Sequence, residues 1–176
     1  KTMSTLFPSI KSIGEGTISK IFYLTAKTIT REIPIKSMGI LMEKGLKAKT
    51  LVITAKDKIC LNNEVKCNPR DCSYAKGHYD RVNDAIMDLF KNENMISRDV
   101  VLKYADKHHV CPFEFSLDIS LYADVVICDY NYVFDPQVYL KRFFDGLASE
   151  YAFLIDEAHN LVDRSREMFS AEINKA

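Results

Sequence analysis

The chain has 176 residues, 47% of them hydrophobic and 27% charged, and its formal net charge is zero. This length suffices for one globular domain, or for one domain with a substantial insertion. No apolar run approaches the roughly 20 residues of a membrane helix, and no segment resembles a signal peptide, so we expect a protein that neither spans a membrane nor is secreted.

The first two residues, Lys1-Thr2, match the end of the phosphate-binding pattern G-x-x-x-x-G-K-[ST]. In that pattern the lysine reaches the β- and γ-phosphates and the threonine hydroxyl binds Mg²⁺. The segment MSTLFPSI follows and fits a helix, and a strand is expected from Lys20. Two residues are a weak motif, and an arbitrary chain boundary explains them too.

Four short β-rich segments predict a sheet: KIFYLT (20–25), KTLVIT (49–54), DVVICD (124–129) and AFLID (152–156). Three of them are continuously apolar, which is typical of parallel strands covered on both faces. Helical patterns lie between them. The sequence therefore predicts an α/β fold with a parallel sheet and crossover helices.

The segment TAKTITR (25–31) follows the first strand and offers hydroxyl groups and positive charge to a phosphate. It belongs to a basic part of the chain: residues 1–60 carry eleven Lys and Arg against four Asp and Glu. Residues 111–176 carry five against twelve. A basic region favours a polyanion partner, although an ordinary helix start and random surface charge explain both features equally well.

The next helix is predicted from the helical spacing of Ile35, Met38, Leu41 and Met42, with Gly45 as its stop signal. Pro34 is tolerated only if it falls in the first turn of that helix.

Residues 60–121 interrupt the α/β rhythm and contain no convincing strand. Two amphipathic helices are expected here, one around residues 82–90 and one around 101–108, with Ser97 as an N-cap. Four of the five cysteines bracket the block. It is interpreted as a small helical insertion, stapled at its base.

Those four cysteines, Cys60, Cys67, Cys72 and Cys111, are sufficient for a tetrahedral zinc or a [4Fe–4S] cluster, and their spacing favours neither metal. Cys111-Pro112 is a weak cue for a cluster. Cys128 lies inside an apolar strand and is expected to be a small core residue. An odd number of cysteines without a secretion signal argues against a disulfide framework and for a reducing compartment.

The last apolar strand ends in Asp156 and Glu157, followed by His159. Paired carboxylates at the carboxyl end of a parallel strand lie where α/β ligands bind. One carboxylate can hold Mg²⁺ while the next orients or deprotonates the attacking water. The alternative is a helix start decorated with acids, which the helix dipole favours.

Together these segments resemble the iron–sulfur DNA helicases of the XPD/DinG type in superfamily two. The matching segments, in order, are the terminal KT, FYLTAKTITR, AKDKICL, VCPFEF, ADVVICDYNYVFDP and FLIDEAHN, the last being the family's DEAH box. The resemblance covers nearly the whole chain. It implies a P-loop NTPase (RecA-like) parallel sheet with a small helical iron–sulfur insertion.

The resemblance also implies roles for individual residues. Lys1 and Thr2 would bind ATP phosphates and Mg²⁺, Asp156 would serve the Mg²⁺, Glu157 the water, and His159 the coupling to a second motor domain. Cys60, Cys67, Cys72 and Cys111 would ligate [4Fe–4S]. Single-stranded DNA would be contacted by Thr25, Lys27, Thr28, Arg31, Lys56 and Lys58, and more weakly by Tyr130 and Asn131.

The resulting interpretation is a fragment of an ATP-dependent, 5′–3′ DNA helicase in the cytoplasm, of bacterial DinG-like type. Residues 1–59 and 122–176 would belong to the first motor domain and residues 60–121 to the cluster domain. The Walker A glycines, the arch and the second motor domain would lie elsewhere in a parent protein, and Lys27 replaces an arginine frequent in relatives. Two alternatives remain: a metal-stapled nucleic-acid-binding module without ATPase activity, and a P-loop nuclease partner.

Overall fold

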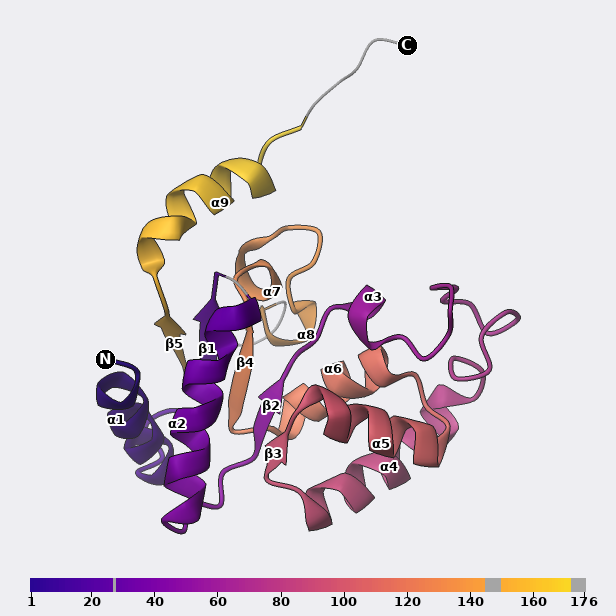
Figure 1. The fold of residues 1–176 in the computed structure, drawn as a ribbon, viewed down its shortest axis with the longest axis horizontal. Helices are drawn as coiled ribbons and strands as arrows, with labels where there is room; N and C mark the ends of the chain where they lie inside the picture. The colour runs from indigo at the N-terminus through magenta and orange to yellow at the C-terminus, as the bar shows by residue number, and fades with distance from the viewer. Residues whose placement is uncertain (27, 145–149, 172–176) are drawn as a thin grey trace.

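The computed structural model describes residues 1–26, 28–144 and 150–171. Its centre is a five-stranded sheet in which every pairing is parallel. The strand order is β3-β2-β4-β1-β5 (Figure 1). The strands are β1 (Lys20–Thr25), β2 (Thr50–Val52), β3 (Met95–Ile96), β4 (Val125–Asp129) and β5 (Tyr151–Ile155). All four predicted strands are present, and the sheet is parallel as the apolar runs indicate.

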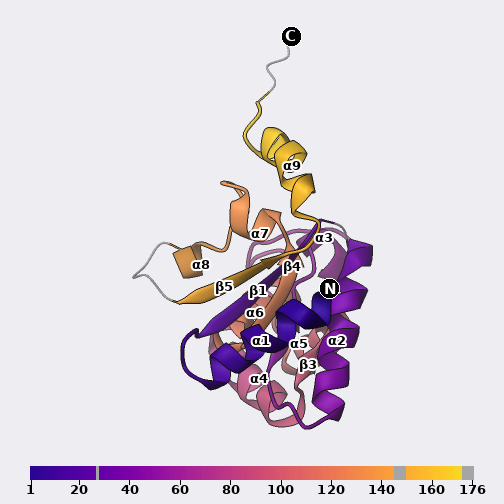
Figure 2. The ribbon, with the colours of Figure 1, turned by 90° about the vertical axis from the view of Figure 1, so that its left-hand side faces the viewer.

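Two hydrophobic cores lie on opposite faces of this sheet, because successive side chains of a strand point to opposite sides. On β1, Ile21 and Tyr23 face one core, and Phe22 and Leu24 face the other. The first core is closed by α1 (Thr2–Gly14) and α2 (Glu32–Glu43), through Leu6 and Met38 among others. These two helices lie together on one side of the sheet (Figures 1 and 2).

The start and end of α2 follow the sequence signals. Pro34 is the third residue of the helix, where its missing N–H costs no intrahelical hydrogen bond. Gly45 adopts a φ of 98°, which allows its N–H to bond to Met42 O at 2.9 Å and close the helix end. A short 3₁₀ turn, η1 (Thr28–Arg31), leads into the helix.

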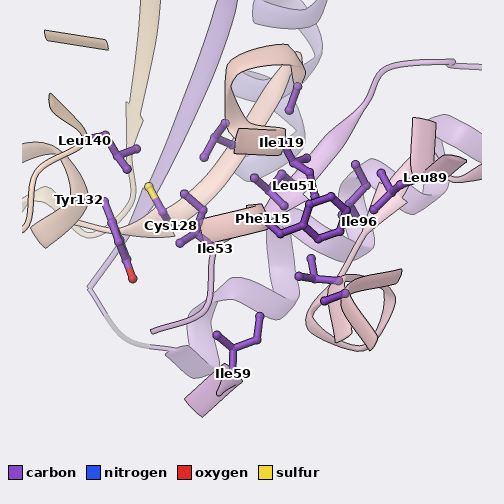
Figure 3. Packing of buried hydrophobic residues seen from close by; sticks show 14 of the residues in the cluster. Leu51, Ile53, Ile59, Leu89, Ile96, Phe115, Ile119, Cys128, Tyr132 and Leu140 are labelled. Atoms are coloured by element: carbon purple, nitrogen blue, oxygen red, sulfur yellow. The ribbon is translucent and has the colours of Figure 1, made fainter. Parts of the chain in front are cut away.

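The second core is larger and is formed mainly by three helices that lie between β2 and β4 in the chain, packed on the strands. They are α4 (His78–Asn92), α5 (Arg98–His108) and α6 (Pro112–Tyr122). Their apolar side chains pack with those of the strands in one continuous cluster, in which Phe115 lies among Leu51, Ile96 and Ile119 (Figure 3). The helical block therefore shares its core with the sheet.

Three details of this block differ from or refine the prediction. The expectation that residues 60–121 contain no strand is wrong, because Met95–Ile96 pairs with Thr50 and Leu51 as β3. This strand has only two residues and is recognisable only by its pairing. Ser97 caps α5 as expected, accepting from Val100 N at 3.4 Å. The third helix, α6, was not predicted.

Helix α6 hides in the sequence because its large apolar residues alternate as in a strand, at positions 113, 115, 117, 119 and 121. Its buried face instead has helical spacing and includes Ser116 and Ser120. Each serine hydroxyl donates to the carbonyl three residues earlier, Phe113 O at 2.7 Å and Leu117 O at 2.6 Å. The serines can therefore be buried without an unpaired hydroxyl.

The remaining elements are short. They are α3 (Lys56–Ile59), α7 (Asn131–Phe134), α8 (Lys141–Phe144), η2 (Ala158–Asn160) and α9 (Leu161–Met168). Helix α9 extends away from the sheet (Figures 1 and 2). Strand β5 is one of the two edge strands and is only partly buried, in contrast to the fully buried strand that its sequence suggests. None of the helices within the described ranges has the length and apolar character that a membrane crossing requires.

Candidate functional site

A hollow of about 380 Å³ lies where β5 ends and α1 begins. Its walls include Lys1 and Thr2 from the start of α1, and Asp156 and Glu157 from the segment after β5. These four residues, from opposite ends of the chain, are the predicted phosphate, Mg²⁺ and water-activating residues. The parallel sheet and the helix that precedes β1 bring them to one edge, where ligands of α/β proteins bind.

The backbone of the two acids is held firmly. Asp156 N donates to Leu24 O at 2.9 Å, which extends the β1–β5 pairing by one residue. Glu157 adopts a φ of 51°, a left-handed conformation that is uncommon for residues other than glycine. Such conformations concentrate at functional sites, where surrounding contacts enforce them. The turn therefore fixes the direction in which the Glu157 side chain leaves the strand.

Tyr130 is one of those contacts. Its side chain is fully buried, and its hydroxyl donates to the backbone oxygen of Asp156 and lies 3.1 Å from that of Glu157. Burial, followed by the nearby carboxylates, raises the pKa of the Tyr130 hydroxyl, so it stays a donor. The sequence placed Tyr130 among the weaker DNA contacts; in the fold it braces the acidic turn from inside. The neighbouring Asn131 N–H bonds to Asp129 Oδ1 at 3.1 Å.

Tyr23, which the sequence patterns do not single out, lines the same hollow from β1. Its hydroxyl donates to Thr2 Oγ1 at 3.3 Å. Burial raises the pKa of this hydroxyl; the hydrogen bond to Thr2 opposes the shift, and the charge of Asp156 adds to it. Tyr23 thus ties the first turn of α1 to the sheet. No local pattern marks it, since its partner lies 21 residues earlier.

His159 lies in η2 and points to solvent, with 74% of its side chain exposed. Its Nδ1 is 3.4 Å from Glu157 Oε2. The histidine is therefore adjacent to the hollow and accessible to another part of a protein, without being one of the residues that line it.

Two of the predicted DNA-contacting residues, Thr25 and Arg31, are less exposed than expected. Thr25 is fully buried, and Arg31 is 8% exposed. Arg31 Nε donates to Thr25 Oγ1 at 3.4 Å and its Nη1 to Ile53 O at 2.7 Å, so the guanidinium joins the ends of β1 and β2. Thr28 begins η1. Lys27 lies outside the described residues.

A second cavity, of about 220 Å³, lies at the base of the helical block. All four cysteines predicted as ligands line it: Cys60, Cys67, Cys72 and Cys111. All four thiols are free. Cys128 is elsewhere, fully buried in β4, where burial raises the pKa of its thiol to about 12. Four of the five cysteines thus share one cavity and Cys128 lies apart from it, while the role of the four as metal ligands stays a prediction.

These cysteines suit an iron–sulfur cluster or zinc by number and chemistry, since four thiolates are the common donor set for both. Asn62 Nδ2 also donates to Cys72 Sγ at 3.1 Å, a contact of the kind that surrounds metal-bound sulfur. Within the described ranges, however, no three side chains of His, Cys, Asp or Glu are close enough to hold a metal ion. The thiols share a cavity but do not yet converge.

Lys56 and Lys58, the predicted basic residues before Cys60, lie on α3. Lys56 Nζ is 4.9 Å from the centroid of the Phe113 ring and lines the cysteine cavity. It also lines a groove of about 540 Å³ that includes Phe113 and Tyr139. Lys58 is exposed, and its carbonyl accepts from Arg98 Nε at 3.0 Å. This side of the molecule therefore combines positive charge with aromatic surface.

Residues 40–176 match the family model described as DEAD_2. The chain belongs to the DEAD_2 family. The match covers more than three quarters of the chain and includes both acids of the hollow and all five cysteines. The predicted relationship to helicases of the XPD/DinG type is confirmed at this level.

Among curated proteins, this DEAD_2 chain is similar to the human "Regulator of telomere elongation helicase 1", with 23% identity over 144 residues. That alignment covers 76% of this chain and 12% of the human protein. The chicken "Fanconi anemia group J protein homolog" is 31% identical over 70 residues, or 40% of this chain and 5% of that protein. The chain thus aligns with 12% or less of the length of these two relatives.

Among solved structures, the chain matches "Truncated XPD" with a TM-score of 0.61 at 22% identity, covering 94% of this chain and 47% of the other. It matches "XPD_Helicase" with a TM-score of 0.54 at 20% identity. At these identities the matches establish the fold. The predicted α/β, RecA-like architecture is confirmed.

Proposed function

We propose that this chain is part of the first motor domain of an ATP-dependent DNA helicase, which couples ATP hydrolysis to movement along single-stranded DNA. The observation that carries the proposal is the meeting of Lys1, Thr2, Asp156 and Glu157 around one hollow. The human relative and one of the matching solved structures are both named as helicases, which supports the proposal. A 5′–3′ polarity is inferred from the XPD/DinG resemblance alone.

Each residue of the hollow has a role suited to its chemistry. The Lys1 ammonium would bind phosphate oxygens of ATP, and the Thr2 hydroxyl and the Asp156 carboxylate would hold Mg²⁺. Glu157 would orient the attacking water and accept its proton. The hydrogen bonds to the backbone of Asp156 and Glu157 support these roles, because a fixed turn keeps both carboxylates aimed at the hollow. His159 would couple the nucleotide state of the site to a second motor domain.

The four cysteines of the second cavity would hold a [4Fe–4S] cluster. Their common cavity and the exclusion of Cys128 support this assignment. When bound, the cluster would link Cys60 at the entry of the helical block to Cys111 at its exit and close that loop. On this basis we assign residues 60–121 to the cluster domain and residues 1–59 and 122–176 to the motor domain, although both share one core.

Single-stranded DNA would lie along the basic side of the molecule. Lys56 and Lys58 would contact its backbone, and Phe113 and Tyr139 in the adjoining groove offer rings on which bases can stack. Lys27 and Thr28 would add contacts at the loop after β1. Thr25 and Arg31 would act indirectly, because their polar groups hold that loop in place.

The five free cysteines favour a reducing compartment, and on that ground we place the protein in the cytoplasm. The human and chicken relatives are animal proteins, so they lend no support to a bacterial type.

The proposal is tested by measuring phosphate release from ATP by the full-length protein, with and without single-stranded DNA. We expect turnover that DNA stimulates, and almost none from residues 1–176 alone. A second motor domain supplies arginine contacts that are worth about 10³-fold or more in rate. DNA binding by the full-length protein without any ATP turnover would contradict the helicase proposal and favour a metal-stapled binding module.

A further inference from the structure

A buried histidine forms part of the wall of the cysteine cavity. His78 begins α4, is 3% exposed and lines the cavity beside Cys111. Its Nδ1 lies 3.2 Å from the backbone nitrogen of Cys111, and its Nε2 lies 3.1 Å from Asp118 Oδ2. Both ring nitrogens therefore have partners, one at a predicted ligand and one on α6.

The partners determine the protonation state of the ring. A backbone N–H can only donate, so Nδ1 must accept and carries no proton. The imidazole is then neutral, and its single proton is on Nε2, where it is donated to the Asp118 carboxylate. Asp118 in turn holds the ring in the orientation that keeps Nδ1 directed at Cys111.

Asp118 is itself held from the other side. Its Oδ1 accepts from Arg142 Nη1 of α8, and Arg142 Nη2 is 3.2 Å from Glu114 Oε2. Burial acts to raise the pKa of Asp118, but the bonds from His78 and Arg142 outweigh this effect and keep the pKa below its ordinary value. The carboxylate is therefore charged and bridges the two groups at neutral pH.

Arg142 connects this chain of contacts to the sheet. The next residue, Phe143, is buried and packs edge-to-face on Phe22 of β1, with ring centroids 5.2 Å apart. Phe143 also packs edge-to-face on Tyr151 at the start of β5, with ring centroids 5.9 Å apart. The contacts therefore run from Cys111 through α4, α6 and α8 to the two strands that border the acidic turn.

We propose that His78, Asp118 and Arg142 form a positioning relay that fixes Cys111 relative to the sheet before any metal binds. The inference rests on the proposed function, because it treats Cys111 as a ligand. Cys67 and Cys72 lie in the loop before α4, whereas Cys111 sits at the start of a packed helix. A fixed Cys111 gives the loop thiols one point on which to converge.

The relay is tested in the full-length protein by amide exchange of the peptide that contains Cys111 and, after anaerobic loading with iron and sulfide, by the rate of iron loss to a chelator. In the metal-free protein, His78→Phe removes both bonds and is expected to speed Cys111 exchange about 3-fold to 10-fold. His78→Asn retains an acceptor at the position of Nδ1 and should largely restore protection. In the loaded protein, His78→Phe and Asp118→Asn should speed iron loss about 10-fold to 100-fold.

Arg142→Met should act in the same direction, and Lys141→Met is its matched control, because it removes the same charge from α8 without a contact to Asp118. Unchanged Cys111 exchange in His78→Phe would overturn the relay. Equal acceleration of exchange in β4 would also overturn it, because it would indicate general destabilisation. If the wild-type protein binds no iron but the exchange results hold, the relay stands and the cluster assignment fails.

Discussion

The hollow at the sheet edge and the cysteine cavity are constructed in different ways. Asp156 continues the pairing of β1 with β5, and Thr2 is fixed to Tyr23 across the sheet edge. Three of the four cavity cysteines instead lie on the stretch from residue 60 to 77, which runs through bends and turns and is mostly exposed. The backbone hydrogen bonds inside that stretch are local, such as Cys72 N to Asn68 O at 3.0 Å.

The difference indicates what each site needs in order to form. Strand pairing and core packing assemble the hollow without a ligand, because the same contacts stabilise the whole sheet. A loop with local bonds and few buried side chains opens easily, so in the proposed cluster site the metal would hold the thiols together. We therefore predict a preformed nucleotide site and a cluster site completed by its metal.

Glu157→Gln tests the preformed site and has the largest expected effect. The variant keeps the shape of the side chain but cannot accept a proton, so ATP turnover by the full-length protein should fall about 10²-fold to 10⁴-fold. Nucleotide affinity should change little, as measured by equilibrium binding. Glu167→Gln, an exposed acid on α9, is the matched control. Turnover close to wild type in Glu157→Gln would show that Glu157 takes no part in ATP hydrolysis.

Serine replacements of single cysteines test the site that the metal completes. After anaerobic purification, each of Cys60→Ser, Cys67→Ser, Cys72→Ser and Cys111→Ser should lose the about four irons per chain of a [4Fe–4S] cluster, measured by iron analysis and visible absorbance. Cys128→Ser should retain them, although burying a hydroxyl in β4 costs about 1–3 kcal/mol of stability. Stoichiometric zinc in the wild-type protein, or loss of colour in Cys128→Ser, would refute the ligand assignment.

Arg31 is buried and Lys58 is exposed, so substitutions at these two basic residues separate a structural role from a role in DNA binding. Arg31→Met removes the bonds to Thr25 and Ile53 and should lower the free energy of unfolding by about 1.5–3 kcal/mol, measured by denaturant titration. Lys58→Met should leave stability within about 0.5 kcal/mol. It should weaken single-stranded DNA binding on any sequence and reduce the slope of the salt dependence by about 1. The reverse pattern would show that Arg31, not Lys58, contacts the nucleic acid.

Tyr130→Phe examines how firmly the acidic turn is held. Loss of the hydroxyl leaves a carbonyl of the turn without its donor and should cost about 0.5–1.5 kcal/mol of stability. Turnover should also fall, because the turn is then less well fixed. Tyr122→Phe, at an exposed tyrosine, is the control. Full turnover with reduced stability would limit Tyr130 to a role in folding.

Lys20 reports on the junction between the sheet and the helical block. Its ammonium donates to Ser120 O at 2.9 Å at the end of α6, and burial lowers its pKa from 10.5 to about 8. Between these two values the unfolded chain binds more protons, so stability should rise with pH in this window. In denaturant titrations, the free energy of unfolding of the wild-type protein should increase relative to that of Lys20→Met as the pH rises above about 8. A constant difference would mean that Lys20 does not titrate there.

The sequence predicted the features that have a local signal. Strand β1, the stop at Gly45 and the cap at Ser97 depend on short patterns, and all are present. Helix α6 was missed because its alternating apolar residues imitate a strand, and β3 because two residues carry no pattern.

In the two candidate sites as well, the residues that belong to a local sequence motif could be predicted. Motifs identified Asp156, Glu157 and the four cysteines, which line the two cavities. Tyr23 and His78 could not be found, since their partners lie 21 and 33 to 40 residues away in the chain. The burial of Arg31 was equally invisible, because a basic residue in a polar segment gives no indication that it bonds to the backbone beyond β2.

The most direct test of the difference between the two sites is amide exchange on the full-length protein, metal-free and after anaerobic loading with iron and sulfide. We expect peptides of β1, β4 and β5 to be protected equally in both states, whereas residues 61–77 should exchange rapidly without metal and more slowly after loading. Strong protection of residues 61–77 in the metal-free protein would contradict the account. So would loss of protection in β5 when the metal is removed.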